Sequence, residues 1–267
     1  MCRAPLRVSR SHHARRLASV RTPASVLADI LRSDPARPRV TFYEDTAGPT
    51  RGERIELSGK VLSNWISKAG NALQDEYDLA PGSVVRLSLP PHWRALYWAF
   101  AVWSVGGTVD LAEGPTPDLL ICDDPNAIAA MLEPTPGDVV LVTLGALARI
   151  HPGPVPAGAM DEARDLATYG DRFAALADPA PGHLALITDG ARTAYRDVVP
   201  HRNWPANTRV SLAGDLARVL ESTLAAWAVD GSVVLARNGQ LAGGEPQPER
   251  LSSERVTLDL AAEPETR

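Results

Sequence analysis

Apolar residues recur at helical spacing in four stretches, which predict the main helices at residues 24–32, 58–73, 92–105 and 216–229. In the second stretch they share one helix face: Val61, Leu62, Trp65, Ile66, Ala69 and Leu73. Ser58 stands where a hydroxyl suits the N-cap of that helix. Residues 92–105 are apolar almost all round, so we expect that helix to be covered on most sides. Shorter helices are expected at residues 126–132 and 161–168.

Short runs of aliphatic and β-branched residues predict strands between these helices. The runs cover residues 40–43, 54–57, 84–89, 108–111, 119–122, 139–143, 184–188, 209–212 and 232–236. The first two are separated by a Gly- and Pro-containing turn at residues 47–53, which indicates a hairpin. Because strands otherwise alternate with helices, the pattern favours an α/β fold with mostly parallel sheets and flanking helices.

Loop-forming residues divide the chain into two expected lobes. We expect packed lobes at about residues 24–145 and 180–240, joined by a stretch rich in Pro and Gly. Residues 1–22 are expected to form a disordered basic tail. Residues 241–267 are expected to form a polar tail, in which Pro246 and Pro248 prevent a regular helix.

Charge is distributed unevenly along the chain. Residues 1–21 carry six arginines and no acid, which gives this segment a net charge of +6. Since the whole chain has a net charge of −5, the remaining residues carry −11. An acidic body argues against nucleic-acid binding, which needs clustered Lys and Arg. The basic segment is a disordered or wrongly assigned start, or else an Arg- and Ser-rich arm that resembles a targeting segment.

Hydropathy and cysteine content point to a protein of the cytoplasm. No apolar run reaches the roughly 18 residues that a membrane span needs. Cys2 and Cys122 are too few for a disulfide framework, which favours a reducing compartment.

Three blocks of the chain carry a characteristic order of helix, strand and glycine. The first runs from Ile55 to Pro91 and includes the segment LAPGSVVRLSLPP. The second runs from Trp93 to Leu111 and contains a Gly106-Gly107 pair, and the third is residues 216–235. Together they resemble the front half of AMP-binding enzymes, the adenylate-forming, acyl-CoA-synthetase-like family. The resemblance implies that family's N-terminal α/β fold.

Two further segments resemble a smaller group of proteins related to this family. Residues 154–161 (PVPAGAMD) and 169–173 (YGDRF) are similar to parts of a short actinobacterial family of uncharacterised proteins related to AMP-binding enzymes. This resemblance implies a small stand-alone protein and brings no known activity with it.

The phosphate loop of AMP-binding enzymes has a degenerate counterpart here. That loop, [ST]-[SG]-G-[ST]-T-G-x-P-K, surrounds phosphates with backbone N–H groups, hydroxyls and a Lys. Residues 188–196 (TDGARTAYR) match it in part, and the resemblance implies cofactor-binding roles for Thr188, Gly190, Thr193 and Arg196. However, Asp189 places negative charge where phosphate would lie. A surface loop is therefore the leading interpretation, and ATP or AMP binding is the alternative.

The family's later motifs, which hold metal and ribose, have no counterpart in the chain, and neither does its C-terminal lobe with the catalytic Lys. We therefore expect no catalytic residue, no bound metal and no cofactor. The resemblance then implies a non-catalytic binding or interaction module with another protein chain as partner. The alternative is a partial adenylate-forming, acyl-CoA-ligase-like subunit or a nucleotide sensor that a partner chain completes.

Other chemistry-bearing patterns favour structural roles. Ser104 lacks the first Gly of a nucleophile elbow and lies at a predicted helix end. The histidines lack metal-ligand spacing. Cys122 precedes two acids at a predicted strand end, where a reactive thiol is not favoured. Five aromatic residues are expected to be core, with an exposed binding strip as the alternative: Trp93, Tyr97, Trp98, Phe100 and Trp103.

Overall fold

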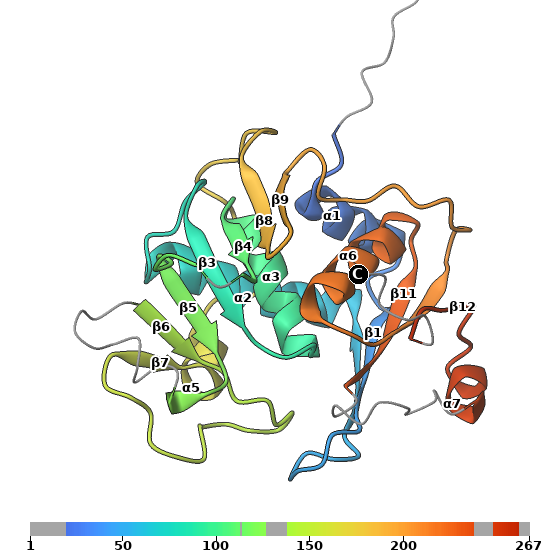
Figure 1. Ribbon diagram of the computed structural model, residues 1–267, viewed down its shortest axis with the longest axis horizontal. Helices are drawn as coiled ribbons and strands as arrows, with labels where there is room; N and C mark the ends of the chain where they lie inside the picture. Colours follow the sequence, from blue (N-terminus) through green and yellow to red (C-terminus); the bar gives the residue numbers. More distant parts are fainter. Residues whose placement is uncertain (1–19, 113, 127–137, 238–247, 262–267) are drawn as a thin grey trace, which may run out of the picture.

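Two β-sheets with helices packed against them form the protein (Figure 1). This computed structural model describes residues 20–112, 114–126, 138–237 and 248–261. The five-stranded sheet has the order β12-β10-β11-β1-β2. Its strands are β1 (Pro38–Glu44), β2 (Arg54–Ser58), β10 (Arg209–Leu212), β11 (Ser232–Arg237) and β12 (Leu258–Asp259).

The seven-stranded sheet has the order β7-β6-β5-β3-β4-β8-β9. Its strands are β3 (Val84–Ser88), β4 (Thr108–Asp110), β5 (Leu119–Cys122), β6 (Asp138–Leu141), β7 (Ala159–Asp161), β8 (Leu184–Thr188) and β9 (Ala191–Ala194). Only the β1–β2 and β8–β9 pairs are antiparallel among the described strands. The predicted mostly parallel α/β architecture is therefore confirmed.

The sheets do not divide the chain where we expected. Strands from the range 24–145 and strands from the range 180–240 occur together in each sheet. Strand β1 pairs with β11, with Phe42 opposite Leu235, and β4 pairs with β8, with Val109 opposite Leu186. Contiguous lobes at 24–145 and 180–240 are thus wrong, because the chain leaves the five-stranded sheet after β2 and returns to it only at β10.

The main helices begin and end close to the predicted residues. They are α1 (Pro23–Ser33), α2 (Gly59–Asp75), α3 (Trp93–Ser104) and α6 (Leu216–Ala228). The Ser58 hydroxyl accepts a hydrogen bond from the backbone N–H of Val61 at 3.3 Å, as predicted for an N-cap. Helix α3 contacts α1, α2 and α6, so it lies at the centre of the helical layer.

The hydrophobic core joins the two sheets through α3. All five aromatic residues predicted as core, from Trp93 to Trp103, are at most 3% exposed. Phe100 of α3 packs on Trp227 of α6 with ring centroids 4.7 Å apart. Burial of this aromatic surface on both sides of α3 makes the two sheets parts of one core. No described helix has the length and apolar character required to cross a bilayer.

The C-terminal segment corrects another expectation. Residues 248–253 form the short helix α7 (Pro248–Ser253), and β12 adds a strand beside β10. Pro248 is tolerated because it occupies the first position of the helix, where its missing N–H would have no helical partner. The expected helix at 126–132 lies almost wholly outside the described residues, as do residues 1–19 of the basic tail.

The segment between β6 and β8 is mostly irregular, as expected, with α5 (Glu162–Asp165) and a 3₁₀ helix (Leu166–Thr168), but it also contains the short strand β7, which was not predicted. Side chains of α2 fix part of it: Asn71 donates hydrogen bonds to the carbonyl oxygens of Gly170 and Arg172, both at 2.9 Å. Lys68, one turn earlier on the same helix, donates to the carbonyl oxygen of Ala167 at 2.9 Å. We call residues 166–176 the strap.

Candidate functional site

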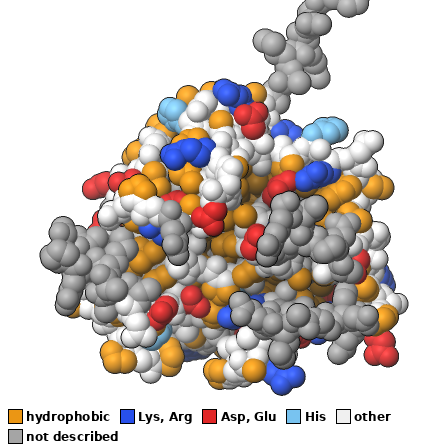
Figure 2. All heavy atoms as spheres, in the orientation of Figure 1, with side chains coloured by type: hydrophobic (Ala, Val, Ile, Leu, Met, Phe, Trp, Pro, Cys, Tyr) orange, Lys and Arg blue, Asp and Glu red, His pale blue; other side chains and the backbone are white. Residues whose placement is uncertain are grey.

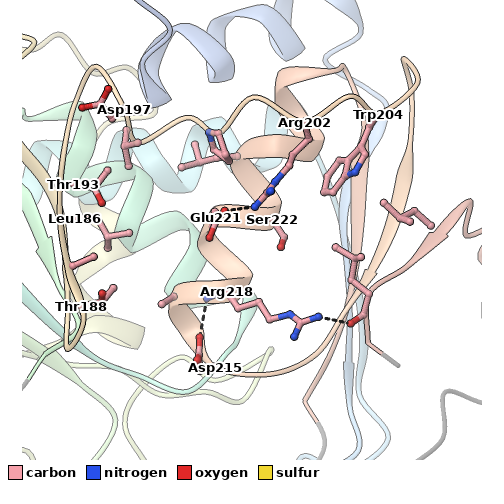
Figure 3. Close-up of a pocket in the computed structure, with 17 residues that line it drawn as sticks. Leu186, Thr188, Thr193, Asp197, Arg202, Trp204, Asp215, Arg218, Glu221 and Ser222 are labelled. Carbon is pink, nitrogen blue, oxygen red and sulfur yellow. Dashed lines mark hydrogen bonds and ion pairs between the residues drawn. The ribbon is translucent and has the colours of Figure 1, made fainter. Parts of the chain in front are cut away.

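A groove separates the β8–β9 hairpin from helix α6 (Figure 3). A cavity of about 870 Å³ lies between them, and an adjoining hollow of about 620 Å³ shares Thr188, Asp215 and Ala217 with it. We call the two together the hairpin–α6 groove. Volumes of this size fall in the range of cofactor and small-molecule sites.

The groove lies where strands of both sheets end. Ser88 and Thr188, the last residues of the parallel strands β3 and β8, line it. From the other sheet, β10 ends at Leu212 and leads to Asp215, the N-cap of α6. Ligand sites in open α/β sheets characteristically lie beyond the carboxyl ends of the strands. The groove therefore occupies the position in the fold where a ligand site is expected.

Most of the segment that we interpreted as a surface loop belongs to a tight hairpin, because residues 188–194 form the end of β8, the turn and β9. Thr188 pairs with Ala191 across the two-residue turn Asp189-Gly190. Neither Asp189 nor Gly190 has a positive φ, so this turn does not use the left-handed backbone conformation that glycine favours. Since strand side chains alternate, Leu186 and Thr188 of β8 and Thr193 of β9 present their side chains to the groove.

The four predicted binding residues are only partly brought together. Thr188 and Thr193 line the larger cavity, and Gly190 lines the adjoining hollow. Arg196 lines neither; its side chain is 58% exposed and forms an ion pair with Asp197 at 3.2 Å. Among the described residues, the hydroxyls of Thr188 and Thr193 have no hydrogen-bond partner. Those two hydroxyls are therefore available to a ligand, whereas the guanidinium of Arg196 is paired with Asp197, a residue that lines the larger cavity.

The roof of the groove comes from residues that the sequence analysis did not select. Residues 197–204 cross above α6 and contribute Arg202 and Trp204, which Figure 3 shows over the helix. At the far end, Leu258 and Leu260 close the cavity beside Arg218, whose guanidinium donates to the carbonyl oxygen of Leu260 at 2.8 Å. One weak indication of these residues was present in the sequence, because Trp204 is an isolated aromatic residue within a polar stretch.

Acidic groups outnumber basic ones in the groove. Its carboxylates are Asp189, Asp197, Asp215 and Glu221, and its guanidinium groups are Arg202 and Arg218. Arg202 forms an ion pair with Glu221 at 2.5 Å, and Asp215 accepts a hydrogen bond from the backbone N–H of Arg218 at 2.7 Å. The side chain of Asp189 has no ion-pair partner among the residues described. A triphosphate would thus meet uncompensated negative charge at the hairpin turn.

The alternative chemical sites have structural explanations. The Ser104 hydroxyl donates to the carbonyl oxygen of Phe100 at 2.7 Å within α3, so it is not poised as a nucleophile. Burial raises the pKa of the Cys122 thiol to about 11, which keeps it protonated near neutral pH. Burial also lowers the pKa of His92 well below its usual value, which leaves this N-cap of α3 uncharged. The described residues contain no group of three or more potential metal ligands.

Surface charge gives no indication of nucleic-acid binding on the face drawn in Figure 2. There, Lys and Arg side chains are dispersed among acidic and hydrophobic ones, and no continuous basic surface is visible. A phosphate backbone would find no basic track on this face.

Comparison with solved structures places the fold. The chain aligns over 89% of its length with an acyl-CoA synthetase of Brucella canis (TM-score 0.63, 14% identity, 47% of that chain). It aligns equally far with the nonribosomal peptide synthetase FmoA3 (TM-score 0.64, 17% identity, 25% of that chain). VinN in complex with 3-methylaspartate gives a TM-score of 0.60 at 16% identity, over 90% of this chain and 65% of that one. The fold is that of AMP-binding enzymes.

At these identities the AMP-binding likeness concerns the fold alone, and the chain spans only part of each neighbour. In sequence, the chain is 36% identical over 151 residues to a TIGR03089 family protein of Mycobacterium tuberculosis. That match covers 55% of this chain and 60% of the relative. No family model matches the chain. The expected resemblance to the N-terminal region of AMP-binding enzymes and to an uncharacterised short family is confirmed.

Proposed function

We propose that this protein is a non-catalytic member of the AMP-binding fold that binds a ligand in the hairpin–α6 groove. The observation that carries the proposal is the composition of the groove. It has the volume and the position of a ligand site, yet it carries Asp189 at the hairpin turn and more carboxylates than guanidinium groups. Such a groove favours a neutral or cationic ligand over a polyphosphate.

The absence of adenylating chemistry follows from the residues around the hairpin. No Lys lines the groove, and Arg196 lies outside it. Transfer of an adenylyl group needs positive charge at the phosphates, where it develops in the transition state. We place the protein in the cytoplasm, because Cys122 is a buried free thiol.

A second candidate is a nucleotide sensor or a partial adenylate-forming subunit that a partner chain completes. The unpartnered hydroxyls of Thr188 and Thr193 favour it, since hydroxyls beside a hairpin turn suit phosphate or ribose oxygens. Under this alternative a metal ion or a partner's cation would have to offset Asp189.

A thermal-shift titration of the full chain with ATP, AMP and ATP plus Mg²⁺ separates the two. A ligand at about 100 times its dissociation constant stabilises by about 2.7 kcal/mol, which for this size is about 5 to 10 °C. We expect no shift with millimolar ATP. A rise of that size that disappears in T188V/T193V, but persists in Arg196→Ala, would overturn the non-catalytic assignment and place the nucleotide in the groove.

A further inference from the structure

Strand β9 is the last strand of the seven-stranded sheet and borders the hairpin–α6 groove. One of its edges pairs with β8, and its outer edge has no partner among the described strands. Figure 1 shows β9 between β8 and α6. Ala191 and Arg192 are exposed, so solvent reaches the start of this strand. An exposed strand edge presents unpaired N–H and C=O groups with which a further extended chain can pair.

The turn determines which main-chain groups of β9 point outward. Thr188 pairs with Ala191 across the two-residue turn, so the N–H and C=O of Ala191 point toward β8. Because this direction alternates along an antiparallel strand, the N–H and C=O of Arg192 point to the outer edge. No described residue outside the hairpin pairs with either group. The C=O of Ala194 differs, because it accepts a hydrogen bond from the backbone N–H of Asp197 at 2.9 Å.

The side chains of β9 define what an added strand would carry. Ala191 and Thr193 line the groove, and Arg192 between them faces the other side of the sheet. Arg192 is exposed and has no ion-pair partner among the described residues. An added strand places one side chain directly opposite it, about 5 Å away between Cβ atoms, where an acid is favoured. The neighbouring side chains enter the groove, where Leu186 and the Thr193 hydroxyl suit neutral groups.

The edge of the other sheet at β2 is less suited to such a partner. Strand β2 is also the last strand of its sheet, but its exposed residues Arg54 and Glu56 already form an ion pair with each other at 2.9 Å. Charges along an edge strand discourage pairing with another chain. The combination of an open edge, an unpaired charge and an adjoining groove therefore distinguishes β9 from β2.

We propose that β9 and the groove bind an extended peptide segment of a partner protein, which adds to the seven-stranded sheet as a further strand and places an acidic residue opposite Arg192. The inference rests on the proposed function, that the groove is a ligand site, and names its ligand class. Hydrogen bonds to the main chain of Arg192 supply affinity, and alternate side chains of the peptide enter the groove and supply selectivity.

Selection from a peptide library tests whether the full chain binds such segments. Short random peptides displayed on phage are selected on the natural chain at about 0.15 M salt, and the enriched sequences are synthesised with a fluorescein label for anisotropy. We expect these sequences to be rich in β-branched or aromatic residues and to contain Asp or Glu. Failure to enrich any sequence overturns the inference.

Two variants at one position separate the main chain from the charge. Arg192→Gln removes the charge, and Arg192→Pro also removes the outward N–H, which takes no part in the hairpin. We expect the affinity to fall about two- to fivefold in Arg192→Gln and about threefold or more beyond that in Arg192→Pro. Arg172→Gln removes an exposed arginine of the strap as the matched control and should change the affinity less than twofold. Equal affinities of the two Arg192 variants overturn strand addition.

Methylation of the peptide main chain gives the same test without any change in the protein. Alternate N–H groups of an added strand face β9, and the others face away. We expect N-methylation at one set of alternate positions to abolish binding and methylation at the other set to leave it within about twofold. Equal effects of the two sets overturn the inference, whatever the melting temperature of Arg192→Pro.

A charge reversal tests the acid opposite Arg192. Arg192→Glu should weaken the selected peptide, and replacing the acid of the peptide by Lys should restore binding to this variant. The basic segment 1–21 is present in every variant, so its attraction for acidic peptides is the same throughout. Absence of restoration overturns the assigned pairing.

The proposed function fails separately. A nucleotide-dependent melting shift that is lost in T188V/T193V overturns it, whether or not peptides bind. No peptide enrichment together with no nucleotide shift overturns strand addition alone, and the groove then takes a ligand of another class.

Discussion

Arg94 and Glu162 form an ion pair inside the core, with Arg94 Nη1 2.7 Å from Glu162 Oε1. The two side chains are 4% and 0% exposed. The Tyr97 hydroxyl donates to the same carboxylate oxygen, and Arg94 Nη2 donates to the carbonyl oxygen of Gly145 at 3.0 Å. Helix α3 therefore holds the irregular segment between β6 and β8 through charged hydrogen bonds. Burial raises the pKa of Glu162, and Arg94 offsets only part of that rise.

Removing one member of this pair is expected to cost more than removing both. Glu162→Ala leaves the Arg94 guanidinium buried without a counter-charge, and we expect a loss of about 3–5 kcal/mol in the free energy of unfolding. The double variant R94L/E162L removes both charges and should lose clearly less. Urea unfolding of Arg94→Leu, Glu162→Leu and the double variant R94L/E162L measures the coupling. Additive losses would show that the pair contributes no mutual stabilisation.

The lowered pKa of Glu254 leads us to expect that the protein loses stability in acid. Burial alone would raise the pKa of this carboxyl, but hydrogen bonds from Tyr43, Arg54 and Arg209 outweigh it and hold the pKa below its usual value. The native state therefore binds a proton less readily than the unfolded state, and its stability falls as the pH drops below the ordinary Glu pKa of about 4.5.

Glu254→Gln should lower stability at pH 7 and flatten the decline between about pH 5 and pH 3, because the group that titrates is gone. Urea midpoints across this range measure both effects. Exposed Glu221→Gln is the control and should leave the slope close to that of the natural chain. If the urea midpoint of Glu254→Gln declined with pH as steeply as that of the natural chain, other carboxylates would be responsible for the acid sensitivity.

Most of the fold was readable from the sequence because its helices and buried strands have clear periodicity. Strands β5, β8 and β10 occur at the predicted residues, and Ser58 caps α2 as predicted. The lobe boundaries and the role of the C-terminal segment were not readable. They depend on which strands pair, and two residues of β12 carry no periodic signal of their own.

Among the glycines that the structure describes, Gly231 leaves the least room for a methyl group. A Cβ there would lie 2.2 Å from the carbonyl oxygen of Thr208 and 2.7 Å from that of Ala226. Both are backbone atoms at the start of β10 and the end of α6, which cannot move aside independently. We expect Gly231→Ala to destabilise by about 1–3 kcal/mol, as overpacking does in tight sites.

Gly190 supplies the matched comparison, because a Cβ there would meet no atom within 4 Å. Gly190→Ala should change the free energy of unfolding by less than about 0.5 kcal/mol. Thermal or urea unfolding of the two variants is the measurement. Similar losses in both would mean that the chain relaxes around residue 231 more easily than its backbone contacts indicate.

The candidate site was predictable only in part. Thr188, Gly190 and Thr193 were selected by resemblance to a phosphate loop, and the hairpin places them along one groove. Trp204 and Arg202 were missed because they belong to an irregular segment that lies above α6 only in three dimensions. Arg196 was selected by its position in the motif, but it does not line the groove and instead pairs with Asp197, which does.

The strap gives a prediction about local stability. Asn71 donates two hydrogen bonds to strap carbonyl oxygens, and Phe173 of the strap packs against Gly70. Asn71→Ala removes both hydrogen bonds, which we expect to lower the free energy of local opening by about 1–2 kcal/mol. Such a change raises the open population by a factor of about 5 to 30.

Limited trypsin digestion measures the local opening of the strap directly, because Arg172 lies exposed within the strap. Cleavage after Arg172, followed by mass spectrometry, should accelerate in Asn71→Ala by about the same factor, provided that closing is faster than cleavage. Lys60→Ala, at an exposed position of the same helix, should leave the rate unchanged. An unchanged rate in Asn71→Ala would mean that Lys68 and the packing of Phe173 hold the strap without the Asn71 hydrogen bonds.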